Sequence, residues 1–521
     1  MSETNHPKAL ARSRTVAVIG SGAMGAGIAQ VAAAAGYTVQ LFDTRPEAVA
    51  KAITDISAMF DKLASKGRMS TAEAHAASGH LRAATTLSAL AEAGLVVEAI
   101  VENLDVKRKL FTDLEEVVAD DCIFASNTSS ISITSIGAAL RLPQRLVGMH
   151  FFNPVPLMAL VEIISGLASD VSVAACVYDT ALAWGKHPVH TKSTPGFIVN
   201  RVARPYYAEA LRLLSEQAAE PATIDAILRE AGGFRMGPFE LMDLIGHDVN
   251  FAVTQSVFQA YFTDPRFTPS LIQQELVNAG FLGRKSGRGF YRYGDAATVA
   301  TPATPATPAT EALTALTTHA TQIFGVSALA EALASRLSGV SVERSKAAAG
   351  TDHLVLQCGS AQAYLTDGRS ATQRAADNHH ADTVLIDLAL DFNSATRLAV
   401  TPADQCSEAA YASIVALLQA AGFAVSRLDD VPGMAVMRTV AMLANEAADT
   451  VNQGVCSSAD ADMAMQKGVN YPRGPLAWAD AIGLETIATV LSHLAQAYGE
   501  DRYRVSPLIM RKRASGGRFH V

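Results

Sequence analysis

The sequence predicts an α/β fold: a doubly wound sheet, then an all-α domain, a degenerate partial α/β segment and a second all-α domain. Near the N-terminus, TVAVIG, a glycine-rich turn, AGIAQVAAAAG and YTVQLFD have the pattern of one strand–helix–strand unit. From Pro195 onward, amphipathic segments rich in Ala, Leu and Glu replace the strand-like runs, which indicates helices. A later part of the chain repeats the helical motifs at a constant offset.

Length, charge and cysteine content limit the classes of function. At 521 residues the chain is too long for one core, so we expect roughly two to four domains. The net charge of −8 is spread without a Lys/Arg run, which argues against a nucleic-acid or membrane partner. The five cysteines form no CxxC pair, so neither a metal site nor a disulfide framework is expected. Because no signal segment or long apolar run occurs, a cytoplasmic location is expected.

The segment GSGAMG follows the first predicted strand and opens the first predicted helix. It places Gly20, Gly22 and Gly25 in the pattern G-x-G-x-x-G. Glycines allow a tight turn and the close approach of a pyrophosphate to the helix N-terminus. Asp43, at the end of the next strand, would accept hydrogen bonds from ribose hydroxyls and favour NAD over NADP, although Arg45 softens that choice. The pattern predicts a Rossmann-type NAD-binding domain, with a glycine-rich helix start without a ligand as the alternative.

Polar residues follow the next two strand-like runs. In VVEAIVENLDVKRKLF, Glu98 lies in an apolar strand, where a carboxylate is costly unless it is paired. Glu102 fits either a charge at a helix N-terminus or a ligand contact at the carboxyl edge of the sheet, and composition leaves both open. The residues of SNTSS are typical of turns and helix caps, while its position at a strand end keeps a ligand role open for Ser129.

The segment HFFNPVPLMALVE contains two apolar runs separated by a chain reversal. If the runs pair antiparallel about Pro156, His150 and Glu162 lie opposite each other. A carboxylate that faces an imidazole fixes its tautomer and stabilises the imidazolium, which a general base requires. The alternative is a structural His–Glu pair, the commoner role of a single histidine.

The helical part of the chain occurs twice. TPGFIVNR at Thr194 matches VPGMAVMR at Val431, and MGPFELMDLIG at Met236 matches RGPLAWADAIG at Arg473. The second copy keeps these packing motifs but has no G-x-G-x-x-G, as expected of a scaffold without chemistry. The same offset puts Asp387 at the position of His150, Ala399 at Glu162, Leu390 at Asn153 and Met437 at Asn200.

These observations give the expected division of the chain. A Pro/Thr/Ala repeat between the two halves is typical of an extended linker. The expected segments are a disordered tail (1–14), the NAD-binding domain (15–191), a first helical domain (192–293), a linker (294–312), a degenerate partial α/β segment (313–428) and a second, non-catalytic helical domain (429–521).

Several separate stretches together resemble one enzyme family. VIGSGAMGAGIAQ, VVEAIVENLDVKRKLF, ASNTSS, GMHFFNPVPLMALVEII, TPGFIVNR, MGPFELMDLIG and GRKSGRGFY occur in the order and spacing of the NAD-dependent L-3-hydroxyacyl-CoA dehydrogenases. The match covers about residues 14–293. The duplicated architecture resembles the long bacterial members that act in phenylacetate catabolism and 3-hydroxybutyryl-CoA metabolism, on 3-hydroxyadipyl-CoA or 3-hydroxybutyryl-CoA.

The resemblance implies roles for individual residues. His150 matches the catalytic base, Glu162 its acidic partner, and Ser129 and Asn200 substrate-contacting polar groups. Lys66 matches a lysine that contacts CoA, whereas Met59 stands where the family has a serine for the same moiety. The residues matching the dinucleotide site are Gly20, Ser21, Gly22, Ala23, Met24, Gly25, Asp43, Glu102, Lys107, Ser129 and Asn153.

The resemblance also implies an assembly. In related short enzymes the helical domain forms a dimer, so the second copy is expected to pack on the first as an internal pseudo-dimer, with a homo-oligomer also open.

Arg201 and Arg204, beside Asn200, are candidates for contacting a dicarboxylic substrate. The alternatives are a gulonate-type hydroxy-acid dehydrogenase and a non-catalytic NAD-binding or structural protein. A decarboxylating dehydrogenase is disfavoured because such enzymes use a catalytic lysine.

Overall fold

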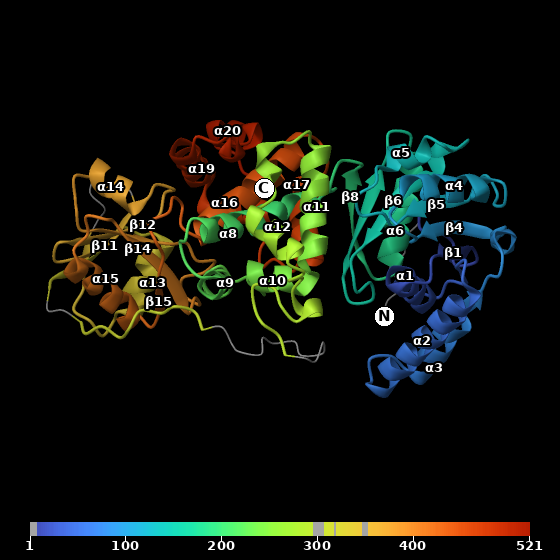
Figure 1. Ribbon diagram of the computed structural model, residues 1–521, viewed down its shortest axis with the longest axis horizontal. Coiled ribbons are helices and arrows are strands. Elements are labelled where there is room, and N and C mark those ends of the chain that lie inside the picture. The colour runs from blue at the N-terminus through green and yellow to red at the C-terminus, as the bar shows by residue number, and fades with distance from the viewer. Residues whose placement is uncertain (1–7, 295–306, 317–318, 346–352, 521) are drawn as a thin grey trace. The chain divides into compact units, whose positions relative to one another are not determined.

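The computed structural model describes residues 8–294, 307–316, 319–345 and 353–520. It divides into two compact units (Figure 1). Unit 1 comprises Met1–Arg201 and Gln453–Val469, and unit 2 comprises Val202–Asn452 and Asn470–Val521.

Unit 1 is built on an eight-stranded sheet in the order β3-β2-β1-β4-β5-β6-β7-β8. All neighbouring strands are parallel except β6 and β7, which are antiparallel. Strand β1 lies where the order reverses, as in a doubly wound fold. The strands are β1 (Thr15–Ile19), β2 (Val39–Phe42), β3 (Leu81–Ala83), β4 (Ala93–Glu98), β5 (Ile123–Ser126), β6 (Leu146–Phe151), β7 (Leu160–Ser165) and β8 (His187–Lys192).

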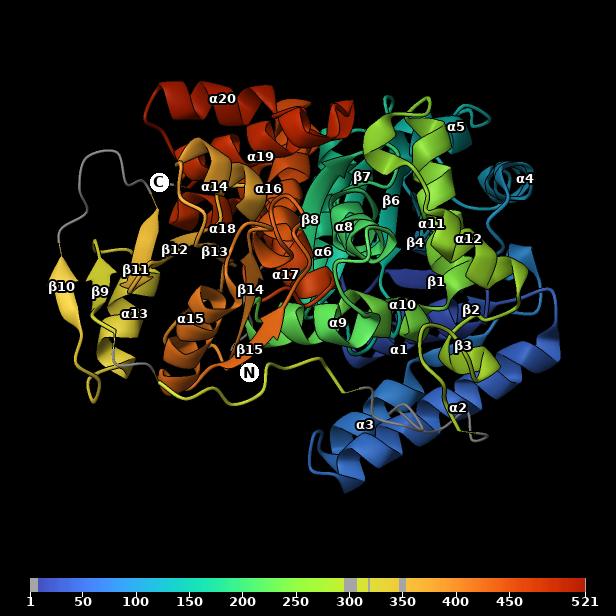
Figure 2. The same ribbon diagram turned by 60° about the vertical axis from the view of Figure 1, so that its left-hand side comes forward.

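Helices cover both faces of this sheet because its strands are apolar on both sides. One core contains buried residues of α1, α2, α3 and α6, and the other contains buried residues of α4 and α5. Helices α2 and α3 pack side by side at one end of the unit (Figures 1 and 2). The helices are α1 (Ala23–Ala34), α2 (Pro46–Ser65), α3 (Thr71–Gly79), α4 (Leu104–Glu115), α5 (Ile133–Gly137), α6 (Val171–Ala183), α7 (Val199–Val202) and α17 (Ser458–Gly468).

Helix α17 completes unit 1 although it lies far along the chain. It packs on β7 and β8, and Lys192 N–H donates to Val455 O at 2.9 Å. A Cβ added to Gly468 would lie 2.5 Å from the Leu160 side chain, so the helix and the strand meet closely. The sequence repeat predicts that 453–469 belongs to the second helical domain, whereas these contacts associate that segment with the first sheet.

Residues 8–14, expected to be part of a disordered tail, instead contact unit 1; residues 1–7 lie outside the described residues. Leu10 packs against the core, and its N–H donates to Thr180 Oγ1 at 2.9 Å. Arg14 pairs with Asp121 at 2.9 Å. The segment is held because one apolar side chain, that of Leu10, is partly buried and its backbone N–H has an acceptor.

Unit 2 contains a second sheet in the order β10-β9-β11-β12-β13-β14-β15. It mixes parallel and antiparallel pairs, with α13, α14 and α15 packed on it (Figure 2). The strands are β9 (Thr321–Phe324), β10 (Glu343–Ser345), β11 (Leu354–Cys358), β12 (Ala361–Leu365), β13 (Thr383–Ile386), β14 (Arg397–Pro402) and β15 (Ala424–Arg427). These helices are α13 (Ala328–Arg336), α14 (Ala371–Asp377) and α15 (Glu408–Ala420).

The rest of unit 2 is helical. Helix α8 packs against α16, which is buried along almost its whole length, and α9 packs against β14. The first set of helices is α8 (Arg204–Ser215), α9 (Pro221–Glu230), α10 (Pro238–Ile245), α11 (His247–Ala260) and α12 (Leu271–Asn278). The second set is α16 (Val436–Asn452), α18 (Pro475–Ile482), α19 (Leu484–Tyr498) and α20 (Pro507–Ala514).

The two halves of the chain share their backbone conformation at several positions that the sequence repeat aligns. Helix α15 has the length of α6, and β13 pairs antiparallel with β14 as β6 pairs with β7. Phe197 and Met434 both have a positive φ, 48° and 54°. Gly246 and Gly483 agree within a degree, at 98° and 99°. The second copy therefore retains the fold of the last part of the first α/β domain.

The described part of the expected linker, 307–312, has no helix or strand; residues 295–306 lie outside the described residues. It is nonetheless attached to unit 2. Ala309 N–H donates to Thr223 Oγ1 at 2.8 Å, and Glu311 N–H donates to Val425 O at 2.8 Å.

Among the helices in the described ranges, none combines the length and the apolar composition needed to cross a membrane.

Candidate active site

His150 and Glu162 form a buried pair in unit 1. They are register partners at the centre of the antiparallel pair β6–β7, as the sequence predicts. His150 Nδ1 lies 2.8 Å from Glu162 Oε2, and Phe152 and Phe197 contact the imidazole ring. Because the carboxylate engages Nδ1, Nε2 is the ring nitrogen left to accept a proton. The pair has the geometry of a base and the group that orients it.

The second carboxylate oxygen of Glu162 accepts hydrogen bonds from the backbone. Glu162 Oε1 accepts hydrogen bonds from the N–H groups of Ile198 and Val199, each at 3.0 Å. These donors lie at the start of α7, where backbone N–H groups have no partner within the helix. The carboxylate is therefore fixed from two sides, which holds the imidazole in one orientation.

Glu98, the carboxylate in the apolar strand β4, is paired with Lys107. Both side chains are buried, and Lys107 Nζ lies 2.6 Å from Glu98 Oε1. Ser126 Oγ donates to the other carboxylate oxygen at 2.6 Å. Lys107 also lies 3.3 Å from Glu102, so one buried ammonium links two carboxylates at the carboxyl edge of the sheet. Lys107 therefore fixes the positions of both carboxylates.

Glu102 organises the loop that carries Ser129. Its Oε1 accepts hydrogen bonds from Thr128 Oγ1 at 2.6 Å, Ser129 N–H at 3.0 Å and Ser130 Oγ at 2.9 Å. Burial would raise the pKa of Glu102, but these hydrogen bonds and Lys107 outweigh it and hold the pKa below its ordinary value. Asn200 Nδ2 donates to Ser129 O at 3.5 Å. The structure thus brings Glu102, Ser129 and Asn200 together.

A cleft of about 890 Å³ opens beside the glycine-rich turn. Its lining includes Gly20, Gly22 and Asp43, and its size suits a dinucleotide moiety. Asp43 accepts hydrogen bonds from Ser21 N–H at 2.9 Å and Ser21 Oγ at 2.8 Å. Partial burial would raise the pKa of Asp43, but hydrogen bonds from Ser21 and Arg45 hold it below its ordinary value. Asp43 is therefore ionised and fixed at the edge of the cleft.

The glycines of the turn fit a bound pyrophosphate. Gly20 has φ +102°, and a Cβ there would lie 2.4 Å from Ala99 O, so the fold itself requires glycine. A Cβ on Gly25 would lie 1.8 Å from Gly20 O. At Gly22, by contrast, a Cβ would meet no described atom within 4 Å. Glycine at that position leaves space over the N-terminus of α1, where Ala23 and Met24 begin the helix.

Two residues that carry no role in the sequence-based predictions support the His150–Glu162 pair. Asn127 Oδ1 accepts a hydrogen bond from Phe151 N–H at 2.8 Å and so fixes the end of β6. Buried Lys186 donates to Met158 O at 2.8 Å and also to Val155 O, which holds the loop between β6 and β7. Burial lowers the pKa of Lys186 to about 8. Asn127 stands in SNTSS, but Lys186 has no local sequence signal because its acceptors are backbone carbonyls distant in sequence.

Three other residues named from the sequence lie apart from the described polar network. Asn153 is exposed in the loop after β6. Lys66 is the exposed residue at which α2 ends, and Met59 is an exposed residue of the same helix. Within the described residues, no hydrogen bond or ion pair connects Lys66 or Asn153 to the His150–Glu162 pair. Their ligand roles stay predictions.

Comparison with known proteins agrees with this geometry. Residues 15–194 match the NAD-binding domain of 3-hydroxyacyl-CoA dehydrogenase, and 196–293 and 433–520 match its C-terminal domain. Residues 363–432 match the reduced Rossmann-fold domain of 3-hydroxybutyryl-CoA dehydrogenase.

Some similar proteins match nearly the whole chain, and others match about half of it. The chain is 44% identical to the 3-hydroxyadipyl-CoA dehydrogenase of Escherichia coli K12, over 96% of this chain and 97% of that protein. It is 43% identical to human mitochondrial hydroxyacyl-coenzyme A dehydrogenase, over 53% of this chain and 90% of that protein. A crystal structure of 3-hydroxybutyryl-CoA dehydrogenase from Escherichia coli K12 superposes with a TM-score of 0.84 at 42% identity, covering 96% of this chain and 99% of that one. The chain belongs to the 3-hydroxyacyl-CoA dehydrogenase family.

Proposed function

We propose that this protein oxidises (3S)-3-hydroxyacyl-CoA thioesters to 3-oxoacyl-CoA with NAD, using His150 as the general base. The observation that carries this proposal is the buried His150–Glu162 pair, in the same unit as the cleft at the glycine-rich turn. A His–Glu pair can accept the hydroxyl proton, and the cleft can hold the oxidant. The relatives named above support the substrate class.

The proposed mechanism assigns one task to each side chain. Bound NAD supplies the hydride acceptor. Nε2 of His150 takes the proton of the C3 hydroxyl as the C3 hydrogen leaves with its electron pair, and the C3–oxygen bond becomes a carbonyl. Glu162 stabilises the resulting imidazolium, because one of its oxygens already lies 2.8 Å from Nδ1. Ser129 and Asn200 orient the hydroxyl and thioester oxygens, while Asp43 receives the adenosine ribose.

A substrate panel tests the reaction. The purified protein is assayed with 3-hydroxybutyryl-CoA, 3-hydroxyadipyl-CoA and free gulonate, each with NAD and with NADP. We expect oxidation of CoA thioesters with NAD, and a preference for NAD over NADP because fixed Asp43 repels a 2′-phosphate. Oxidation of gulonate in preference to every thioester would favour the hydroxy-acid alternative. Bound NAD without turnover of any substrate would favour the non-catalytic one.

We also propose that the two helical copies form an internal pseudo-dimer. Arg438 of α16 lies 2.7 Å from Glu209 of α8, and both side chains are buried. Arg266 pairs with Asp449, while Arg212 lies over the Tyr503 ring at 5.6 Å. Positions 266 and 503 are equivalent in the repeat, as are 212 and 449, so the two contacts are reciprocal. Reciprocal contacts are the mark of a two-fold interface.

Truncation after residue 293 tests the pseudo-dimer. The shortened chain loses α16, which packs against α8, and α17, which packs on β7 and β8. We expect it to self-associate through the exposed face of α8 or to lose stability, which sedimentation velocity and thermal unfolding would detect. A stable monomer with full activity after this truncation would contradict the proposal. We also propose a cytoplasmic location, to which the five free cysteines are suited.

A further inference from the structure

Arg204 is a buried arginine of unit 2 whose charge is not balanced by a carboxylate of the described residues. Among those residues, the other arginines of this unit that are buried to the same degree each form an ion pair: Arg266 with Glu446, Arg374 with Asp367, Arg397 with Glu230 and Arg438 with Glu209. A buried charge without a counter-ion is costly. At Arg204, unit 2 therefore lacks one negative charge.

Thr254 and Tyr207 hold the guanidinium of Arg204 in place without neutralising it. Its Nη1 donates to Thr254 Oγ1 at 3.1 Å, and that hydroxyl donates in turn to Asn250 O at 3.0 Å. The guanidinium carbon lies 4.8 Å from the centre of the Tyr207 ring. The Nε atom is buried and has no hydrogen-bond partner within the described part of the chain. Burial lowers the pKa of Arg204, but an arginine keeps its proton at neutral pH, so a fixed positive charge remains.

Arg204 lines a cavity of about 280 Å³ on one face of α8. The described residues that line this cavity all belong to unit 2. Its walls include the buried apolar side chains of Leu211 and Phe267. Leu271, which is 78% exposed, and exposed Thr268 also line it, so the cavity is open to solvent there. One charged group, apolar walls and an entrance are the features of a small-molecule site.

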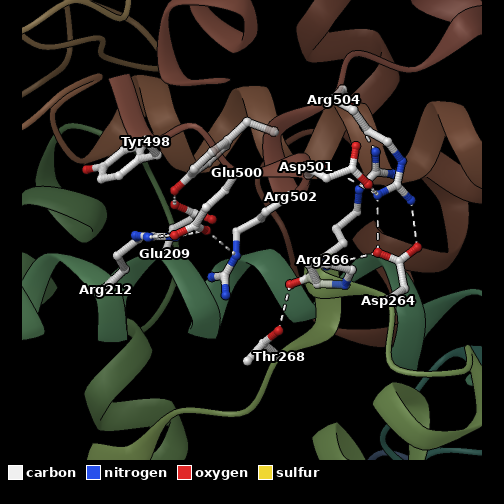
Figure 3. A network of polar contacts seen from close by, with 12 residues as sticks. Glu209, Arg212, Asp264, Arg266, Thr268, Tyr498, Glu500, Asp501, Arg502 and Arg504 are labelled. Atoms are coloured by element: carbon white, nitrogen blue, oxygen red, sulfur yellow. Dashed lines mark hydrogen bonds and ion pairs between the residues drawn. The ribbon is translucent and has the colours of Figure 1, made fainter. Parts of the chain in front are cut away.

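The other arginines that line the cavity are neutralised by the protein itself. Their ion pairs join Arg212 to Glu216 and Glu500, Arg266 to Glu446 and Asp449, and Arg502 to Glu500. Figure 3 shows this network, with Arg212 directed toward Glu500. A ligand in the cavity therefore meets one unmatched positive charge, that of Arg204.

The second helical copy has apolar residues at the places of Arg204 and Thr254. The repeat aligns Arg204 with Ala441 and Thr254 with Leu491, and both of these apolar residues are fully buried. The helical scaffold therefore packs at this place without a polar pair. Replacing a buried polar pair by apolar groups is often neutral or stabilising. Since folding does not require Arg204 and Thr254, binding of a ligand is the better reason for them.

We propose that this cavity binds a small organic monocarboxylate with an apolar body, held by an ion pair with Arg204. One carboxylate matches one unmatched guanidinium and can accept two parallel hydrogen bonds from it. The apolar body would lie against Tyr207, Leu211 and Phe267. The volume suits a ligand of about ten non-hydrogen atoms, much smaller than an acyl-CoA or a dinucleotide. The site is additional to the proposed reaction, and neither NAD nor the thioester has a role in it.

The single unmatched charge determines which ligands are selected. Inorganic phosphate carries more than one negative charge at neutral pH, and Glu216 also lines the cavity, so phosphate is disfavoured. A neutral ligand such as benzamide leaves Arg204 without a counter-ion. We expect benzoate to bind with a dissociation constant on the order of 10⁻⁴–10⁻³ M. Benzamide, which has the same shape, should bind about 10–100-fold more weakly.

Saturation-transfer NMR with benzoate as the probe tests the site in the full-length protein. The titration is repeated with benzamide, and inorganic phosphate is added as a competitor. We expect an equal concentration of phosphate to leave bound benzoate in place. Saturating NAD should also leave it in place, because other residues line the cleft at the glycine-rich turn.

Two variants test the role of Arg204. Arg204→Leu is expected to weaken benzoate binding about 10–100-fold. Arg204→Ala combined with Thr254→Leu reproduces the residues of the second copy, so it should lose binding and keep the native midpoint of thermal unfolding. Arg288→Leu is the matched control, because Arg288 also lies over an aromatic ring, Phe281 at 3.8 Å, but does not line the cavity. The control should bind benzoate within about twofold of the native protein.

Benzoate binding that requires Arg204 and persists with NAD supports the proposal. No binding of benzoate, or equal binding of benzoate and benzamide, would overturn it whether or not the variants fold. Equal losses in Arg204→Leu and Arg288→Leu, or displacement of benzoate by NAD or by an equal concentration of phosphate, would also overturn it. Displacement by adipyl-CoA but not by hexanoyl-CoA would instead assign Arg204 to a dicarboxylic substrate and remove the additional site. None of these measurements uses turnover, so the proposed function is tested separately.

Discussion

Replacing His150 by glutamine is expected to lower turnover about 10²–10⁴-fold while NAD binding persists. Glutamine can still occupy the site, but it cannot accept a proton at neutral pH, so the C3 hydroxyl would lose its proton without a base. Steady-state kinetics and calorimetric titration with NAD measure the two effects separately. The NAD cleft should be unaffected because its lining does not include His150.

His190 provides a matched control for this substitution. It lies in β8 of the same sheet, but its ring stacks on Tyr178 at 4.4 Å instead of pairing with a glutamate. His190→Gln should therefore keep near-native turnover. Near-native turnover in His150→Gln would remove the proposed base, and a similar loss in both variants would indicate a general effect of altering the sheet.

Replacing Asp387 by alanine is expected to lower the free energy of unfolding by about 3 kcal/mol without changing the kinetic constants. Asp387 stands at the position equivalent to His150 in the second copy. Its carboxylate accepts hydrogen bonds from Ala435 N–H at 2.9 Å, Val436 N–H at 2.7 Å and Met437 N–H at 3.0 Å. Burial raises the pKa of Asp387 to about 6, so the acceptor is ionised at neutral pH. Leu388 N–H also donates to this carboxylate at 2.8 Å, so removing the carboxylate leaves four buried donors unpaired.

Comparing Glu162→Ala with Asp387→Ala separates a structural effect from a catalytic one. Glu162 accepts from Ile198 and Val199, the equivalents of Ala435 and Val436, and also orients His150. Its removal should therefore lower both stability and turnover. Chemical denaturation and steady-state kinetics on both alanine variants make the comparison. Asp404→Ala, which removes an exposed carboxylate of the same α/β segment that accepts no hydrogen bond within the described residues, should change the free energy of unfolding by less than about 0.5 kcal/mol. Reduced turnover in Asp387→Ala would contradict a purely structural second copy.

The second copy retains a carboxylate at the place of the His150–Glu162 pair, which the sequence repeat alone does not reveal. The loss of both His150 and Glu162 there predicts that the scaffold folds without the pair. The structure shows that it retains one carboxylate at this place, supplied by the residue that follows β13 and not by β14. A sequence alignment shows Glu162 replaced by Ala399 but cannot show that Asp387 has taken over the same N–H groups. The relation becomes visible only once the register of the two strands is known.

The contact between His150 and Glu162 was predictable because its determinants are local. A chain reversal about Pro156 fixes the register, and a one-residue slip would move every side chain to the other face. Glu98 was predictable as a residue in need of a partner, but its partner, Lys107, comes from the following helix and is buried. Arg204 was a candidate only for its place beside Asn200. Its partner Thr254 comes from α11, and that contact depends on tertiary structure that no local pattern specifies.

The position of α17 has a consequence for the order in which the protein matures. Lys192 and its partner Val455 are separated by more than half of the chain. At ribosomal rates of roughly 5–20 residues per second, the nascent first sheet waits on the order of tens of seconds for this helix. During that time the surface of β7 and β8 that α17 later covers stays open to solvent or to a chaperone. The oxidoreductase domain is thus finished by one of the last helices to leave the ribosome, which ties its maturation to synthesis of nearly the entire polypeptide.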